Sequence, residues 1–257
     1  MGEIESVLIL IGVAAFMAGF VDAVVGGGGL IQIPALFSAF PSASPATLFG
    51  TNKIASIVGT SSAAVQYSRR VPIPWKIALP GALAALVGAW FGARAVAWMP
   101  VEYLRPLVLI LLVLVAVYTF VRKDFGTASS RQALGRRDVG VAVTIALTVG
   151  FYDGFFGPGT GSFFIFLLVR FVALDFLHAS ATAKVLNVAT NLAALSFFAA
   201  NVELLWKAGV LMAVCNLGGA LIGSRLAIRH GAAFVRQIFL FVVTVLIAKM
   251  AYDLMRG

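Results

Sequence analysis

The sequence has a single cysteine, Cys215, and few charged side chains among its 257 residues. One cysteine cannot form an internal disulfide, which excludes a disulfide-stapled scaffold. Asp, Glu, Lys and Arg together make up 11% of the residues, whereas an average soluble domain has about 25%. The chain is therefore not an ordinary soluble globular protein.

Motifs for common enzyme chemistries are also missing. The glycines at 26–29 are not followed by the Lys-Ser/Thr of a Walker loop, which argues against ATP-driven transport. The G-x-S-x-G and H-E-x-x-H motifs of hydrolases do not occur. His178 and His230 have no partners at metal-ligand spacing. We expect no catalytic residues, no metal site and no cofactor.

Apolar residues dominate what is present, at 61% of the chain, and there are 26 glycines. This composition predicts an all-α polytopic membrane protein that forms one domain over residues 1–257. The N-terminus lacks the positive region of a signal peptide, so the first apolar run should remain as a span. Ten apolar runs fall at about 6–25, 29–40, 46–67, 75–98, 102–121, 138–156, 160–174, 177–200, 206–229 and 232–254.

The net charge of +9 comes from 19 Lys and Arg against 10 Asp and Glu. In a membrane protein, basic residues gather in cytoplasmic loops, so the excess does not indicate a nucleic-acid partner. Residues 122–137 hold five basic residues and one acidic residue, which predicts a cytoplasmic linker. The linker separates a first repeat, 1–121, from a second, 138–257.

The second half repeats the rare residues of the first at a constant offset of 131 positions. An apolar composition alone would not place Asp, Lys, Trp and Arg in one register, so the repeat indicates an internal duplication. The matching pairs are Gly19-Phe20 with Gly150-Phe151, Asp22 with Asp153, Gly26 with Gly157, Thr51 with Thr182, Lys53 with Lys184, Trp75-Lys76 with Trp206-Lys207, and Gly88, Gly92, Arg94 and Arg105 with Gly219, Gly223, Arg225 and Arg236.

The loop charges predict that the two halves have opposite orientations in the membrane. The loop after the third segment holds Arg69 and Arg70 in half one, whereas the matching loop of half two holds Glu203. The loop after the fourth segment has the reverse bias, with Arg229 and His230 in half two. With the linker in the cytoplasm, these biases are satisfied if both termini lie outside.

The second segment of each half is too short to cross a bilayer, so we expect a broken or re-entrant half-helix there. Whether the first two segments form a re-entrant hairpin or a full span followed by a broken helix stays open. Each short segment follows a glycine-rich stretch, at 26–29 and at 157–161. A helix that begins there would direct its N–H groups and its positive dipole end into a cavity, which suits an anion. We assign the Gly88/Gly92 and Gly219/Gly223 pairs to helix packing.

Asp22 and Asp153 lie at the inner ends of apolar runs, where a carboxylate is costly and therefore functional by default. Two roles remain open for them: a proton-coupling carboxyl, or a helix cap that accepts hydrogen bonds from glycine N–H groups. Lys53 and Lys184 begin polar stripes that should face the same cavity, where they could pair with the carboxylates or contact substrate; snorkelling to the interface is the alternative. The expected substrate-binding set is Gly26, Gly27, Gly28, Gly29, Thr51, Asn52, Lys53, Gly157, Gly159, Thr160, Gly161, Thr182, Lys184, Asn187 and Asn191. Ser56 and Thr60 match Asn187 and Asn191.

The two glycine signatures, with Thr51-Asn52-Lys53 and Thr182-Ala183-Lys184, resemble the TauE/SafE sulfite exporter family, also called TSUP. The resemblance covers nearly the whole chain. It implies a prokaryotic inner-membrane permease for sulfur-containing anions such as sulfite or organosulfonates. The direction, export, comes only from the resemblance.

We therefore expect a secondary transporter that works by alternating access and is driven by an ion or proton gradient. A passive anion channel of the same fold and a transporter of another small organic anion are the alternatives. An enzyme is not expected. The expected partners are the small anion and the lipid bilayer, with a homodimer left open.

Overall fold

Helices form every regular element in the part of the chain that the structure describes, which is residues 2–100, 102–103, 110 and 134–256. The structure is a computed structural model, and it describes side chains only between residues 5 and 231 of those ranges. Most of the expected segment at 102–121 and most of the linker at 122–137 lie outside the described residues. The helices are α1 (Gly2–Val25), α2 (Gly29–Ala39), α3 (Pro45–Ser68), α4 (Trp75–Trp98), α6 (Arg136–Phe155), α7 (Thr160–Val172), α8 (Phe176–Asn201) and α9 (Trp206–Arg256).

Two helix starts, those of α3 and α8, follow from side-chain capping. Ser44 caps α3, because its hydroxyl accepts a hydrogen bond from the Thr47 N–H at 3.1 Å. Asp175, which lies 131 positions later, caps α8 by accepting from the N–H groups of Leu177 and His178. Both residue types are favoured N-caps.

The break that the sequence predicts near residue 230 is confirmed inside α9. Gly231 has φ of 71° and ψ of −165°, which are not helical values. The helix therefore consists of two segments that meet at this glycine, and these correspond to the expected segments at 206–229 and 232–254.

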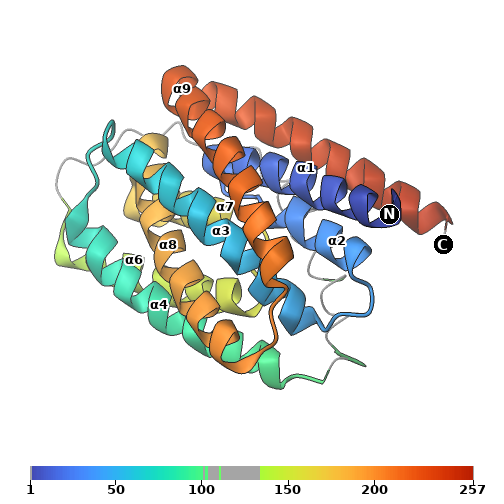
Figure 1. Ribbon diagram of the computed structural model, residues 1–257. Coiled ribbons are helices and arrows are strands. Elements are labelled where there is room, and N and C mark those ends of the chain that lie inside the picture. The colour runs from blue at the N-terminus through green and yellow to red at the C-terminus, as the bar shows by residue number, and fades with distance from the viewer. Residues whose placement is uncertain (1, 101, 104–109, 111–133, 257) are drawn as a thin grey trace.

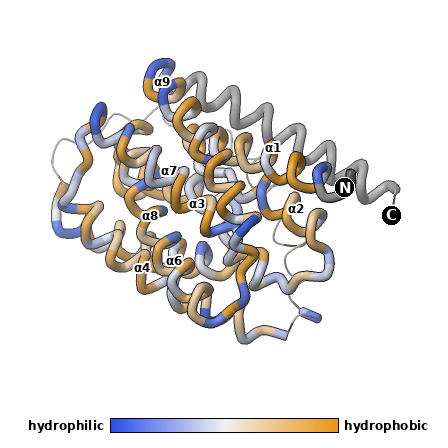
Figure 2. The backbone as a smooth tube through the Cα atoms, in the orientation of Figure 1, coloured by the Kyte–Doolittle hydropathy of each residue, from blue (hydrophilic) through white to orange (hydrophobic). Residues whose placement is uncertain are grey.

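Five helices in the described residues are long and apolar enough to cross a membrane. They are α1 from Glu5, α4, α6, α8 and the first segment of α9. Many of their large apolar side chains are exposed, such as Ile9, Leu83 and Val214, and lipid can cover such surface at no cost. Figure 2 shows hydrophobic colour along the helices and hydrophilic colour at several helix ends. α3 has 24 residues but is not one of the five, and its buried polar residues explain why.

Two long helix pairs, α4 with α6 and α1 with α9, form the most extensive helix contacts (Figure 1). Glycine allows the close approach in both: a Cβ on Gly88 would collide with the Leu147 carbonyl, and a Cβ on Gly219 would collide with the Phe16 carbonyl. Gly88 and Gly219 are 131 positions apart, as are Phe16 and Leu147. The packing role expected for these glycines is confirmed, and each half packs on the other through equivalent contacts.

The two short helices each follow a longer one and pack beside it. α2 has 11 residues and α7 has 13, so α2 spans only about 17 Å. α2 runs back along α1 in Figure 1, and α7 packs on α6. α1 is long enough to span and α2 is not, so the choice between a re-entrant hairpin and a full span followed by a broken helix stays open.

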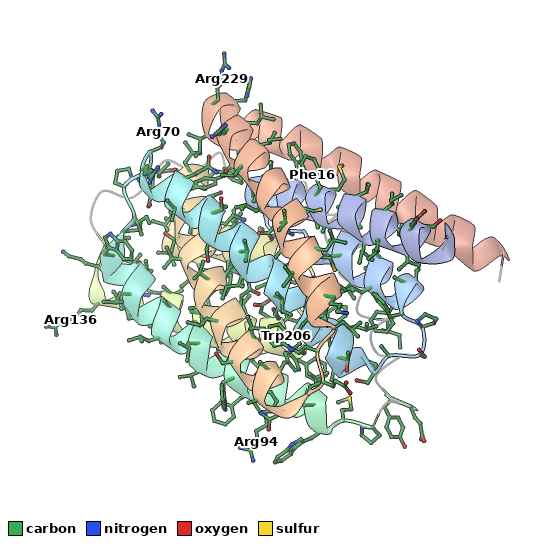
Figure 3. The ribbon with its side chains drawn as sticks, viewed as in Figure 1. Phe16, Arg70, Arg94, Arg136, Trp206 and Arg229 are labelled. Atoms are coloured by element: carbon green, nitrogen blue, oxygen red, sulfur yellow. The ribbon has the colours of Figure 1, made fainter. Side chains whose placement is uncertain are left out.

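Basic residues at helix ends divide between the two ends of the bundle (Figure 3). Arg70, Arg136 and Arg229 lie at the upper and left ends of their helices, whereas Arg94 and Trp206 lie toward the opposite end. The turn after α3 and its repeat equivalent, the turn before Trp206, thus lie at opposite ends.

Candidate functional site

The two glycine-rich turns meet each other in the interior. Gly26 has φ of 81° and Gly157 has φ of 98°, a region that L-residues other than glycine rarely adopt. The Gly26 backbone lies against Gly161, and the Ser162 N–H donates to the Gly26 carbonyl at 3.3 Å. The starts of α2 and α7 are therefore held together, one from each half.

A polar cavity of about 30 Å³ lies beside these turns. One water needs about 10–15 Å³ of such a cavity, so the space suits a small polar ligand. Both halves contribute to its lining. The lining residues are Asp22, Gly26, Gly29, Asn52, Lys53, Ser56, Thr60, Asp153, Gly157, Thr160, Gly161, Asn187 and Asn191.

Lys53 is the cation that lines this cavity among the described residues, and it pairs with Asp153 of the other half. The Lys53 Nζ lies 3.0 Å from Asp153 Oδ1, and the two side chains are 4% and 6% exposed. A buried pair of this kind costs desolvation, and removal of one partner leaves an uncompensated charge. The charge state of each residue thus depends on the other.

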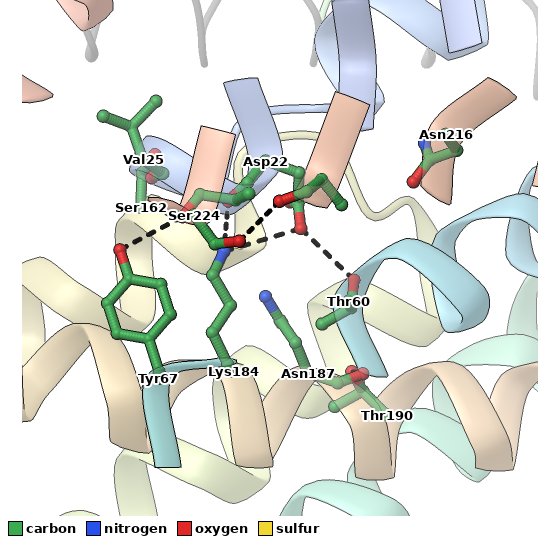
Figure 4. A network of polar contacts seen from close by, with 12 residues as sticks. Asp22, Val25, Thr60, Tyr67, Ser162, Lys184, Asn187, Thr190, Asn216 and Ser224 are labelled. Atoms are coloured by element: carbon green, nitrogen blue, oxygen red, sulfur yellow. Dashed lines mark hydrogen bonds and ion pairs between the residues drawn. The ribbon is translucent and has the colours of Figure 1, made fainter. Parts of the chain in front are cut away.

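Lys184 pairs with Asp22 but lies outside the cavity lining (Figure 4). Its side chain is fully buried, and its Nζ donates to the Asp22 backbone carbonyl and lies 3.5 Å from Asp22 Oδ2. The Thr60 hydroxyl also donates to Asp22 Oδ2, at 3.2 Å. Asp22 therefore has two side-chain partners for one carboxylate oxygen.

The two ion pairs cross between the halves and are related by the repeat, because Lys53 and Lys184 are 131 positions apart, as are Asp22 and Asp153. Neither carboxylate caps the short helix that follows it. α2 and α7 have Gly28 and Gly159 at their N-caps, without a side-chain cap hydrogen bond. Both carboxylates form ion pairs instead, so the geometry does not show the capping role, and the proton-coupling role stays a prediction.

Several expected site residues lie away from the cavity lining. Gly27, Gly28 and Gly159 belong to the turns but do not line it. Thr51 donates to the Thr47 carbonyl at 2.7 Å and accepts from the Leu205 N–H at 3.1 Å, and Thr182 donates to the His178 carbonyl at 2.8 Å, so both hydroxyls have partners away from the cavity. The other expected residues line the cavity, apart from Lys184.

Sequence reasoning missed Tyr67 and Ser162, whose hydroxyls donate to the Ala23 and Val25 carbonyls. It also missed the buried contact between Asn216 and Gln32, whose Nδ2 and Oε1 atoms lie 3.4 Å apart. The available signal was a difference between the halves. At the offset of 131, Tyr67 matches Phe198, Ser162 matches Ile31 and Asn216 matches Ala85.

The site offers an ammonium, amides and hydroxyls to a small ligand. No group of three or more His, Cys, Asp or Glu residues that could hold a metal ion occurs within the described ranges. The arrangement can bind a small polar or charged solute at the junction of two helix breaks.

Comparison with known proteins decides the family. The family model described as "Sulfite exporter TauE/SafE" matches residues 11–250. The chain belongs to this TauE/SafE family of membrane transporters. The assignment agrees with the resemblance read from the glycine signatures.

Relatives of this TauE/SafE chain match it over most of their length. It is 36% identical over 241 residues to "Probable membrane transporter protein ORF9" of Sinorhizobium sp, which covers 94% of this chain and 91% of the relative. It is 35% identical to "Probable membrane transporter protein YfcA" of Escherichia coli K12, covering 93% and 87%. A probable membrane transporter protein of Haemophilus influenzae is 32% identical, covering 93% and 92%. No solved structure matches the chain.

Proposed function

We propose that this TauE/SafE protein is a secondary transporter for small sulfur-containing anions such as sulfite or organosulfonates. The observation that carries the proposal is Lys53, whose ammonium lines a small cavity between two glycine-rich helix breaks. Helix starts and an ammonium both favour negative charge. The family name supports sulfite and related anions as the substrate class, and export as the direction.

We infer that the two halves are inverted-topology repeats in a prokaryotic inner membrane. Arg70 and Arg229 lie at one end of the bundle together with Arg136, which belongs to the basic linker. The positive-inside rule favours the cytoplasm for this end, with both termini outside. Equivalent turns of the two halves would then face opposite sides, as in transporters that bind substrate where two repeats meet.

Alternating access follows from this arrangement. The cavity holds about 30 Å³ and is built from both halves, so movement of one half against the other would open it to either side. The ion pairs that cross between the halves would then be the contacts that change.

Flux measured in proteoliposomes tests the proposal. Purified protein should carry sulfite or a small sulfonate into or out of vesicles, and an imposed pH gradient should drive accumulation above equilibrium. Flux that only equalises the anion concentration would identify a passive channel. A thermal-shift series with sulfite, thiosulfate, sulfate, sulfoacetate and carboxylates should find a stabilising ligand among the sulfur anions, because binding to the native state raises stability. Stabilisation by carboxylates alone would assign a different substrate.

A further inference from the structure

Three side chains hold the inner end of α1 (Figure 4). The Asp22 carbonyl accepts from Lys184, the Ala23 carbonyl from the Tyr67 hydroxyl at 3.2 Å, and the Val25 carbonyl from the Ser162 hydroxyl at 2.7 Å. The last carbonyls of a helix lack partners within it, and the C-terminal dipole end favours a cation. The Asp22 carbonyl also accepts from the Gly26 N–H at 2.8 Å, so Lys184 is its second donor. The Lys184 ammonium thus stabilises the C-terminal end of α1.

The equivalent end of α6 lacks this arrangement. Phe198 and Ile31 replace the two hydroxyl residues at the offset of 131. Lys53 lies against the Asp153 carboxylate, and no described side chain donates to the Asp153 carbonyl. The symmetry of the repeat is therefore broken at the two places where the ion pairs form.

The two carboxylates differ as well. Both line the cavity, but Asp153 Oδ2 is buried and has no hydrogen-bond partner among the described residues. Asp22 Oδ2 is already in contact with Thr60 and Lys184. The charged or titratable groups around Asp153 are Lys53 from α3, Asp22 from α1 and the neighbouring Tyr152 of α6, while α4, α7 and α8 add no charged residue to the cavity lining.

Charge balance links an anion at Lys53 to a proton at Asp153. An anion that contacts the Lys53 ammonium replaces Asp153 as its counter-ion, which leaves one buried cation between two anions. A buried carboxylate without a paired cation is strongly disfavoured. A proton taken from solution onto Asp153 Oδ2 restores the balance, and the net charge of the site is then the same with and without ligand.

This inference rests on the proposed function. We propose that the two ion pairs have different roles in transport. Lys53 and Asp153 bind one monovalent anion and one proton together, whereas Lys184 and Asp22 hold the end of α1 and exchange no proton. The proposal assigns the coupling proton to one carboxyl of the repeat pair.

Proton uptake by the wild-type protein is the direct test. Methanesulfonate is a suitable probe because it stays a monoanion between about pH 5 and 8, so any proton change belongs to the protein. Mixing it with the unbuffered protein in detergent should take up about one proton per anion bound. Binding of methanesulfonate without proton uptake overturns the proposal.

Matched variants then locate the proton. For wild type, the affinity for methanesulfonate should rise about tenfold for each unit by which the pH falls, as one linked proton requires. Asp153→Asn should remove this dependence, and Asp22→Asn should keep it whatever its absolute affinity. Loss of the dependence in Asp22→Asn together with its retention in Asp153→Asn reverses the assignment and refutes the proposal.

The lysines give a second comparison that does not rely on a carboxyl variant. Glutamine can still donate an N–H group but carries no charge. Lys53→Gln should lower the affinity for methanesulfonate at least about tenfold, whereas Lys184→Gln should lower it by less. Equal losses of affinity in the two variants contradict the different roles of the two ion pairs. If wild type binds no methanesulfonate at any pH, the proposed substrate class fails first, and the inference falls with it.

Discussion

At the scale of single residues, the same residue type acquires different tasks from its surroundings. Lys53 and Lys184 occupy equivalent positions of the repeat, yet one lines the cavity and the other lies against the backbone of α1. The difference comes from the neighbours, because Tyr67 and Ser162 have no polar equivalents in the matching positions. A duplicated sequence can therefore keep its polar residues in pairs while only one member of a pair lines the cavity.

Gly26→Ala should destabilise the protein strongly. Gly26 has φ of 81°, and a Cβ there would collide with the backbone of Gly161. The left-handed conformation alone costs a non-glycine residue about 1–2 kcal/mol, and the collision adds to this by pushing the two turns apart. We expect a lower apparent melting temperature in detergent and a smaller yield of monodisperse protein.

Gly27→Ala is the matched control for this substitution. Gly27 is adjacent in sequence, but a Cβ there would have its nearest contact at 3.7 Å, with the Val21 side chain. Its melting temperature should stay close to that of wild type. Equal effects of the two substitutions would mean that the contact between the turns does not determine stability.

At the scale of helices, close packing depends on particular glycines. Gly219→Ala should weaken the α1–α9 pair, because its Cβ would collide with the Phe16 carbonyl. Gly218→Ala should be tolerated, since its Cβ would meet only the Phe16 ring, at 3.5 Å. Small residues that let helix backbones approach drive association in membranes, and thermal denaturation of the two variants should show the larger loss for Gly219→Ala. Similar losses would contradict a specific role for Gly219.

Most helix bounds could be predicted from the sequence because the bilayer sets both the length of the apolar runs and the type of residue at their ends. The run at 75–98 coincides with α4, and the basic and aromatic residues at its ends mark interfaces. The short segments after the glycine stretches were predictable as half-helices, since about 20 residues are needed to span. Caps such as Ser44 and Asp175 shift the other starts by only a residue or two.

Pairing across the site could not be predicted in the same way. The offset of 131 shows that Asp22 and Asp153 are equivalent, but equivalence does not say which lysine each one contacts. That choice depends on how the halves pack, which the approach of Gly88 to α6 and of Gly219 to α1 determines. The exclusion of Lys184 from the cavity depends on the same packing. The sequence alone therefore led us to expect both lysines in the substrate-binding set.

At the scale of the whole molecule, the inverted arrangement predicts that equivalent loop positions lie on opposite sides of the membrane. Arg70 and Asn201 are 131 positions apart and both are exposed. In a Cys215→Ala background, Arg70→Cys should react with a membrane-impermeant maleimide only after the cytoplasmic side is opened. Asn201→Cys should react in cells whose outer membrane has been removed and whose inner membrane is intact.

The two cysteine variants control for each other, since they differ only in the half that carries the reporter. Labelling of both positions from the same side would contradict the inversion, whatever the absolute orientation. Labelling from opposite sides but with the reverse polarity would keep the inversion and contradict the cytoplasmic placement of the linker. The two outcomes separate topology from orientation.

Joint binding of an anion and a proton has a consequence for the energetics of the whole transport cycle. If one monovalent anion moves with one proton, each cycle carries no net charge, and a membrane potential should not drive accumulation. A single net charge would respond to about 100 mV with about 2.3 kcal/mol, which is roughly a 50-fold change in the accumulation ratio.

In proteoliposomes, a potassium diffusion potential should therefore leave methanesulfonate accumulation unchanged, whereas a pH gradient should drive it toward the alkaline side. Asp153→Asn removes the proton but keeps the Lys53 cation, so any flux that remains should become sensitive to the potential. Potential-driven accumulation by the wild-type protein would show that the anion crosses without a proton, and the Lys53–Asp153 pair would then be an anion site without a coupling role.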